Sequence, residues 1–226
     1  MISKTRVLWA GVGMALLVSG SVWAAKPATP AGKFSYAIGV QIAQGLKRDN
    51  LKVEIDPMVD AIRDVMAGRD PQLSREEIQA AFTSYQEDQK KDYLKQAQAN
   101  QERGKAYLDV NRGKDGVTEL ESGVQYHKVK EGKGKQPTTS DTVVVHYRGT
   151  LVDGKEFDSS YSRGEPATFP VNAVIQGWQE VLPLMHVGDK WQVAIPSALA
   201  YGETGAGTSI GPNETLLFEV ELLEIK

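Results

Sequence analysis

The fold of the C-terminal part of the chain is decided by residues 142–155, which read TVVVHYRGTLVDGK. The first residues of this stretch are rich in β-branched side chains, which favour an extended strand. The pair Asp153-Gly154 is a strong short-range signal for a two-residue hairpin turn. The stretch therefore predicts a strand over Thr142–Arg148 and a chain reversal after it, which is the start of an antiparallel sheet.

Further strand signals lie on both sides of this stretch. Alternating or β-rich sequences predict strands over Gly123–Val129, Trp191–Ile195 and Leu216–Ile225. A short helix fits between Gln176 and Met185, and Pro183 interrupts or shortens it. The expected fold class is α+β, with a curled antiparallel sheet around one short helix.

Five blocks of residues occur in this region in a specific order and spacing. They are 145–149 (VHYRG), 153–160 (DGKEFDSS), 174–178 (VIQGW), 200–202 (AYG) and 215–222 (TLLFEVEL). Each block is weak by itself, but all five in order resemble the FK506-binding (FKBP) family of peptidyl-prolyl cis-trans isomerases. The resemblance covers about residues 120–226 and implies an FKBP-type isomerase domain there.

The resemblance also implies an apolar, aromatic substrate pocket. Trp178 would form its floor under the proline ring, and the N–H of Ile175 would bind a substrate carbonyl. Asp158 and Tyr201 would supply polar contacts. The implied catalytic residues are Tyr147, Phe157, Asp158, Val174, Ile175, Trp178, Tyr201 and Phe218, with Phe169 as a substrate-binding residue and Ile210 as another, on a flexible loop over the site.

The alternative is that these rings only fill the interior of the domain. Phe218 and Val174 are expected to pack partly in the hydrophobic core in either case. Tyr147, Asp158 and Tyr201 form a polar trio that has little reason to lie unpaired in a core. The trio therefore favours a pocket over simple packing.

Two positions depart from the family pattern. Ala167 stands where small cytosolic relatives often have a bulky aromatic pocket wall. Gly211 replaces a proline that is common ahead of Pro212. Both departures bear on the peptide preference and on the affinity for rapamycin-like macrolide inhibitors, which the sequence leaves open.

The residue types suit a reaction that forms no covalent bond with the substrate. Rotation about an X-Pro bond has a barrier of about 18–20 kcal/mol, and a dry apolar pocket favours the twisted, less polar transition state. The chain has no cysteine, and its sequence shows no serine–histidine constellation. His127, His146 and His186 have no second ligand at i+3 or i+4, so we expect no metal and no cofactor.

The middle of the chain predicts three helices. In the first, Phe34, Ile38, Ile42 and Leu46 recur every fourth residue and form one apolar stripe. The stripe is the face through which this helix would pack.

The second and third helices have start signals. Asp56 suits the N-cap of the second helix, Pro57 its first position, and Gly68 the position after its end. Ser74 and Glu77 form a capping box at the start of the third.

The third helix is long and mostly polar. No proline interrupts residues 73–111, and residues 86–105 are polar nearly all round. A helix that is polar on every face usually bridges domains through solvent. The apolar helical part is too small for a core of its own, so we expect a homodimer. The alternative is that the helices fold back on the C-terminal domain.

Residues 1–24 have the three-part pattern of a secretory signal peptide. Lys4 and Arg6 precede the uncharged apolar run 7–20, and Val22 and Ala24 suit a cleavage site. The alternative is an uncleaved membrane anchor, whose apolar run usually has about 18 residues or more. We expect export to the bacterial periplasm or outer-membrane surface, and no lipoprotein because no cysteine is present.

Removal of the expected signal peptide changes the net charge, and the rest of the chain is expected to divide into four further parts. Removal of residues 1–24 changes the net charge from −3 to −5, because two basic residues are lost, and this acidic balance argues against a nucleic-acid partner. The expected divisions are a signal peptide (1–24), a linker (25–33), a helical dimerisation region (34–73), a long connecting helix (74–112) and the isomerase domain (120–226).

Residues 209–216 (SIGPNETL), the helical region and the signal peptide resemble the bacterial macrophage infectivity potentiator subgroup of the family. That resemblance implies a homodimer with intertwined N-terminal helices. The expected function is acceleration of X-Pro isomerisation in proline-containing, unfolded or extended exported polypeptides. The alternative is a dimeric chaperone that holds unfolded clients, with isomerase activity secondary.

Overall fold

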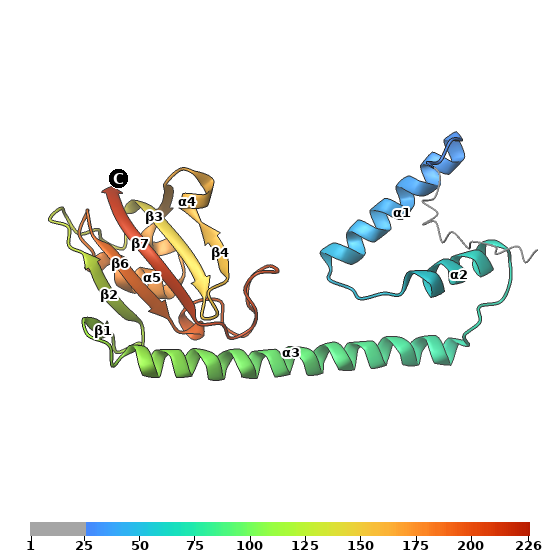
Figure 1. Cartoon of the computed structure of the whole chain (residues 1–226), viewed down its shortest axis with the longest axis horizontal. Coiled ribbons are helices and arrows are strands. Elements are labelled where there is room, and N and C mark those ends of the chain that lie inside the picture. Colours follow the sequence, from blue (N-terminus) through green and yellow to red (C-terminus); the bar gives the residue numbers. More distant parts are fainter. Residues whose placement is uncertain (1–25) are drawn as a thin grey trace, which may run out of the picture. The chain divides into compact units, whose positions relative to one another are not determined.

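The computed structural model describes residues 26–226 (Figure 1). The expected signal peptide, residues 1–24, lies outside this range. The chain divides into two units, one ending at Gln72 and the other running Leu73–Lys226. Among residues 26–226 no helix combines the length and the apolar character needed to cross a membrane.

The first unit contains α1 (Pro30–Arg48) and α2 (Ile55–Met66). α1 begins inside the segment expected to be a linker. Pro30 is its first residue, and the hydroxyl of Thr29 accepts a hydrogen bond from the N–H of Gly32 at 3.0 Å. Proline is well tolerated there because the first N–H groups of a helix have no partner within the helix.

The start predicted for α2 is wrong by about two residues. The N-cap is Glu54, which forms no side-chain capping bond, and Asp56 and Pro57 lie inside the first turn. A proline fits there because that turn has free N–H groups, and the carboxylate of Asp56 interacts favourably with the helix dipole. The predicted end is confirmed, since Gly68 follows the C-cap with φ of 68°.

The second unit starts with α3 (Arg75–Asn111), whose predicted capping box is confirmed. The N–H of Glu77 donates to the Ser74 hydroxyl at 3.2 Å, and the N–H of Ser74 donates to the Glu77 carboxylate at 2.8 Å. These two bonds satisfy donors that a helix start otherwise leaves without partners.

An antiparallel sheet follows α3, and the α+β fold class is confirmed. The strand order is β1-β2-β6-β7-β3-β4, with β5 also paired to β3. The predicted hairpin joins β3 to β4, and Gly154 in its turn has φ of 88°. The strands are β1 (Val117–Glu119), β2 (Gln125–Lys130), β3 (Thr142–Leu151), β4 (Glu156–Ser159), β5 (Ala167–Pro170), β6 (Lys190–Ile195) and β7 (Leu216–Ile225).

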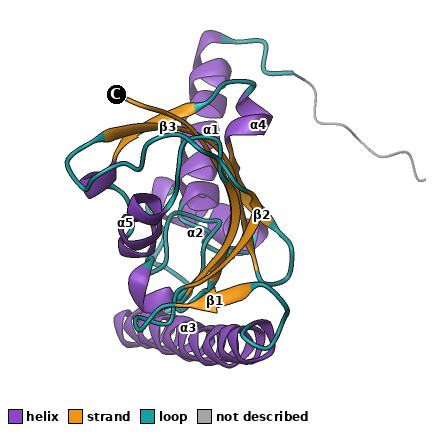
Figure 2. Ribbon diagram, turned by 90° about the vertical axis from the view of Figure 1, so that its left-hand side faces the viewer, coloured by secondary structure: helices purple, strands orange, loops and turns teal. Residues whose placement is uncertain are grey.

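The sheet curls around α5 (Gln176–Val181), which lies against its inner face (Figure 2). The helix gives way to a 3₁₀ turn, Leu182–Leu184, where Pro183 stands, as the sequence predicts. A Cβ at Gly177 would lie 2.4 Å from the side chain of Ile195. Glycine at this position therefore allows α5 to approach β6 closely.

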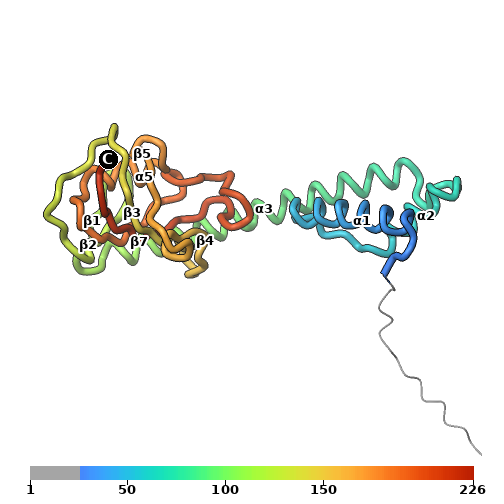
Figure 3. Tube along the Cα trace, turned by 90° about the horizontal axis from the view of Figure 1, so that it is seen from above, coloured from blue at the N-terminus to red at the C-terminus, as the bar shows by residue number. Residues whose placement is uncertain are grey.

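The C-terminal half of α3 packs on the sheet domain, and both are seen together in Figure 3. Ala97, Asn100 and Gly104 are buried. The side chain of the fully buried Gln125 donates to the carbonyl of Leu108 and accepts from Asn111, both at 2.9 Å. The expectation that this helix bridges two parts through solvent is therefore wrong for its second half.

Candidate active site

A cavity of about 440 Å³ lies in the sheet domain beside α5. It brings together every residue that the sequence assigns to catalysis, and also Phe169. Two small residues, Ala173 and Ala200, lie there as well. The full lining is Tyr147, Phe157, Asp158, Phe169, Ala173, Val174, Ile175, Trp178, Ala200, Tyr201 and Phe218.

Two residues singled out in the sequence do not line this cavity. Ile210 is 8% exposed and belongs to the hydrophobic core, where the segment around it pairs with Ala206. Ala167 packs against the same core on β5, opposite Val145. Neither residue forms part of the cavity wall in this structure.

Trp178 is the centre of the aromatic lining. The ring centroids of Phe218, Tyr147 and Phe169 lie 5.3, 5.4 and 6.0 Å from that of Trp178, with interplanar angles of 78°, 89° and 85°. Edge-to-face rings at these distances attract one another beyond simple burial. The indole is 4% exposed, so its surroundings suit an apolar group such as a proline ring.

Local packing sets the positions of the rings. A Cβ at Gly149 on β3 would lie 2.6 Å from the ring of Phe157 and 2.9 Å from that of Phe218. Only glycine leaves room for both rings at this point of the strand. The VHYRG block thus has a physical reason for its last residue.

A polar corner lies next to the rings. The hydroxyl of Tyr147 donates to the Asp158 carboxylate, and Arg163 binds the other carboxylate oxygen. The Arg163 guanidinium also donates to the Tyr147 hydroxyl at 2.9 Å and lies over its ring, 5.5 Å from the centroid. Arg163 was not among the residues predicted from the sequence. It follows Asp158 by five residues on α4 (Ser160–Arg163), a turn for which the sequence has no clear signal.

These contacts favour the charged form of Asp158. Burial alone raises the pKa of this carboxyl, but hydrogen bonds from Tyr147 and Arg163 outweigh it and hold the pKa below its usual value. Burial, followed by the bond to Asp158, raises the pKa of Tyr147. Asp158 is therefore an anion and Tyr147 a neutral donor at neutral pH.

The Ser160 hydroxyl forms hydrogen bonds with the backbone of Tyr147. β5 pairs with residues 142–145 of β3 and β4 with residues 148–150, which leaves Tyr147 between them without a strand partner on that edge. The buried Ser160 hydroxyl accepts from the Tyr147 N–H at 2.8 Å and bonds its carbonyl at 3.2 Å. Its oxygen thus takes the place of a neighbouring strand.

Ser160 also lies 3.0 Å from Nδ1 of His146. The structure therefore does bring a serine next to a histidine, which the sequence does not predict. The hydroxyl is fully buried and is engaged by both backbone groups of Tyr147, so it is not placed to attack a substrate. This pair stabilises β3.

Besides the buried indole N–H of Trp178, two donors of the cavity lining have no hydrogen-bond partner among residues 26–226. The carbonyls of Val174 and Ile175 accept bonds from Gln179 and Trp178, whereas the N–H of Ile175 forms none within the described range. Tyr201 is 42% exposed, and in residues 26–226 its hydroxyl has no hydrogen-bond partner. An apolar floor with a few convergent polar groups is the usual composition of a small-ligand site.

A second hollow of about 470 Å³ lies on the outer face of the same sheet. Arg148, Gln192 and Glu219 line it together with the end of α3. These side chains alternate along their strands with those of the core, and Arg148 and Glu219 carry charges of opposite sign. Because this hollow lacks a cluster of edge-to-face rings, the aromatic cavity is the better candidate for an active site.

Comparison with known proteins points to the same region. Residues 133–223 match the family described as FKBP-type peptidyl-prolyl cis-trans isomerase, and residues 31–127 match the domain amino-terminal to it.

Individual relatives are similar over most of their length. The chain is 46% identical to the FKBP-type 22 kDa peptidyl-prolyl cis-trans isomerase of Escherichia coli, over 84% of this chain and 93% of that protein. It is 39% identical to outer membrane protein MIP of Legionella longbeachae, over 88% and 87%. The crystal structure of FkpA from Escherichia coli matches with a TM-score of 0.63 and 37% identity, over 88% of this chain and 97% of the other.

Proposed function

The chain belongs to the family of FKBP-type peptidyl-prolyl cis-trans isomerases, and we propose that it isomerises X-Pro bonds in the aromatic cavity around Trp178. The enzyme class follows from the family. The assignment of residues is supported by one observation above others, the meeting of the Trp178 ring, the Asp158–Tyr147 pair and the free Ile175 N–H in one cavity.

The cavity suits the physical demands of the reaction. The twisted X-Pro bond has lost its amide resonance, so its carbonyl is less polar than that of the planar ground state. Burial of the proline ring on Trp178 excludes water and favours the twisted form. The Ile175 N–H holds a neighbouring substrate carbonyl, and the Tyr201 hydroxyl and Asp158 orient the chain. No step forms a covalent bond with the enzyme.

Two further properties form part of this proposal. The substrates are proline-containing polypeptides in unfolded or extended form, and the family resemblance suggests rapamycin-like macrolides as inhibitors, of which a cavity of about 440 Å³ would hold only a part. The place of action is the bacterial envelope, supported by the pattern of residues 1–24 and by a relative named as an outer membrane protein.

A proline tetrapeptide assay tests the site. The wild-type protein should accelerate isomerisation well above the uncatalysed rate. Asp158→Ala should lower kcat/KM about tenfold or more, since one lost charge-assisted contact is worth about 1.5 kcal/mol or more. Tyr201→Phe, which removes only a hydroxyl, should lower it a few-fold.

Glu156→Ala is the matched control, because Glu156 is also a carboxylate on β4 but pairs with Arg148 away from the cavity. It should change kcat/KM by less than about twofold. A wild-type rate equal to the uncatalysed one would refute catalysis. Equal activity of the wild type and Asp158→Ala would refute the assigned site.

We also propose that the protein is a homodimer through its N-terminal helices. No residue of α1 is buried, and Phe34, Ile38 and Ile42 are 69%, 42% and 43% exposed. An apolar stripe of this length on a soluble protein is usually an interaction surface.

The second candidate function is the holding of unfolded clients, with isomerisation secondary. It is supported by large apolar side chains that α2 leaves exposed, Val65 at 62% and Met66 at 82%. The discriminating measurement is suppression of aggregation of an unfolded protein by Asp158→Ala. Full suppression by this variant despite its lowered kcat/KM supports holding, whereas a matching loss of suppression ties the effect to the cavity.

A further inference from the structure

The second half of α3 presents a stripe of polar and small residues to the isomerase domain. Tyr93, Gln96, Asn100, Arg103 and Gly104 are spaced three, four, three and one residues apart, so they share one face of the helix. Each of them meets the chain between residues 203 and 215, which leads from the cavity to β7. We call residues 201–215 the rim segment.

Hydrogen bonds tie the first part of the stripe to the rim segment. The hydroxyl of Tyr93 donates to the carbonyl of Glu203. The amide of Asn100 donates to the carbonyl of Pro212 at 2.8 Å, and Asn100 is only 3% exposed. A buried amide with a fixed backbone partner sets the register between the two segments, because breaking it leaves polar groups without partners.

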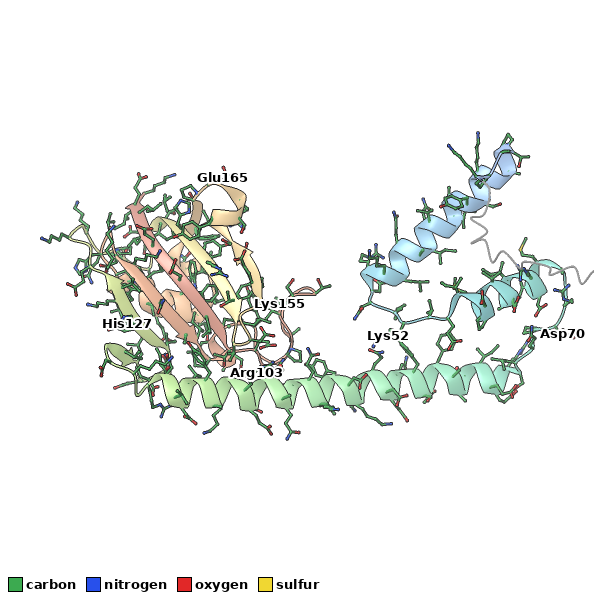
Figure 4. The ribbon with its side chains drawn as sticks, viewed as in Figure 1. Lys52, Asp70, Arg103, His127, Lys155 and Glu165 are labelled. Atoms are coloured by element: carbon green, nitrogen blue, oxygen red, sulfur yellow. The ribbon has the colours of Figure 1, made fainter. Side chains whose placement is uncertain are left out.

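Arg103 connects this bond to a buried carboxylate. Its guanidinium donates to the side-chain oxygen of Asn100 and lies 3.5 Å from a carboxylate oxygen of Glu214. Glu214 is 6% exposed, and its burial raises the pKa of this carboxyl. Figure 4 labels Arg103 where α3 meets the sheet domain.

Two glycines allow the close approach. A Cβ at Gly104 would lie 2.3 Å from Oγ1 of Thr215. A Cβ at Gly211 would lie 3.0 Å from the amide nitrogen of Gln96 and 3.1 Å from that of Asn100. The glycine at position 211, which departs from the family's usual proline, stands where α3 leaves little room for a side chain.

The rim segment is internally braced, so a contact at one end bears on the other. The N–H of Asn213 donates to the carbonyl of Gly202 at 2.8 Å. Ala206 and Ile210 exchange two backbone bonds, at 2.9 and 3.2 Å. Tyr201 lines the cavity and directly precedes Gly202, whose carbonyl accepts this bond. Asn213 directly follows Pro212, which Asn100 holds, so Tyr201 is linked to that part of the rim segment.

We propose that Asn100, Arg103 and Gly104 are positioning residues for substrate binding, which act by fixing the rim segment against α3 so that Tyr201 stays at the cavity. This inference rests on the proposed site for prolyl peptides. Its residues contact no substrate themselves, and the contact lies within the unit Leu73–Lys226.

The first test compares Asn100→Ala with Gln98→Ala in the full-length protein. Gln98 lies on the same helix but is exposed, and among residues 26–226 its side chain bonds only to that of Glu102. Asn100→Ala should raise the KM for a proline tetrapeptide about three- to tenfold, with kcat changed less than about twofold, because binding geometry is altered and the floor of the cavity is not. Gln98→Ala should change neither constant.

Amide hydrogen exchange gives a readout that does not depend on catalysis. The N–H groups of Ala206, Ile210 and Asn213 should exchange faster in Asn100→Ala than in the wild type or in Gln98→Ala. A variant that melts at a lower temperature but keeps the wild-type KM and exchange rates would show a purely structural contact and overturn the proposal.

A compensating pair provides the second test. Gly104→Ala should raise KM and speed exchange, because its Cβ collides with Thr215. Adding Thr215→Gly removes both side-chain atoms that the new Cβ would meet, Oγ1 at 2.3 Å and the Thr215 Cβ at 3.0 Å, and should restore both toward wild type. No restoration by a folded double variant would count against the proposal. Absence of any wild-type catalysis would instead refute the proposed function, and the exchange results would still judge this inference.

Discussion

Arg163 shows how a site residue can escape prediction. Tyr147 and Asp158 belong to blocks of sequence that resemble a known family, so they could be assigned before any fold was known. Arg163 reaches both of them only because α4 turns the chain directly after β4. Four residues of helix carry too little periodicity to be recognised, so neither the turn nor the contact could be predicted.

Arg163→Leu should move the acid limb of activity to higher pH. The native bonds lower the pKa of Asp158, so its stabilising contribution is present above its unfolded pKa of about 3.9 and is lost as the pH falls through the lower folded value. Without Arg163, burial counts for more and the folded pKa rises. The check is kcat/KM for a proline peptide between about pH 3 and 7.

Arg148→Leu is the matched control for this experiment. Arg148 is also an arginine paired with a carboxylate of β4, but its partner is Glu156, outside the cavity. Its pH profile should overlay that of the wild type. If Arg163→Leu overlays it too, Asp158 does not set the acid limb through Arg163.

At the scale of elements, α3 is the helix whose packing differs most from what the sequence predicts. Its start, Ser74, follows from local capping chemistry, which the sequence contains in full. Its packing does not follow from the sequence, because the contact face consists of Ala97, Asn100 and Gly104 rather than of large apolar residues. Periodicity detects apolar stripes, and a stripe built from small and amide side chains has no such signal.

Gln125 fastens the end of α3 to β2, and Gln125→Leu should lower the free energy of unfolding by about 2 kcal/mol. Leucine is similar in size, but it removes bonds to the Leu108 carbonyl, to Asn111 and to Glu119. The measurement is urea unfolding at neutral pH. Gln192→Leu on the exposed face of β6 is the control and should change stability by less than about 0.5 kcal/mol. Equal stability of both variants would show that this contact contributes nothing net.

At the scale of the whole molecule, the two units contrast in how they bury apolar surface. The sheet domain has a continuous core that includes Leu182, Trp191 and Leu222, and its class could be predicted because strand and hairpin signals are local. α1 has an apolar stripe but no buried residue. A stripe shows that a helix needs a partner, and it does not say which one. Hence the sequence predicts association, while the interface itself stays a proposal.

Sedimentation of the double variant Ile38→Asp/Ile42→Asp tests the homodimer. Both side chains lie on the exposed stripe of α1, and two carboxylates would have to be desolvated in an apolar interface. We expect a wild-type dimer, a monomeric double variant, and a kcat/KM per subunit for a tetrapeptide within about twofold of wild type, because the cavity lies entirely within residues 147–218.

Gln41→Asp, on the same helix beside the stripe, should remain dimeric. A monomeric wild type would refute the dimer, and a double variant that stays dimeric would move the interface away from α1. A monomer that loses tetrapeptide activity would mean that the cavity depends on a second copy of the chain.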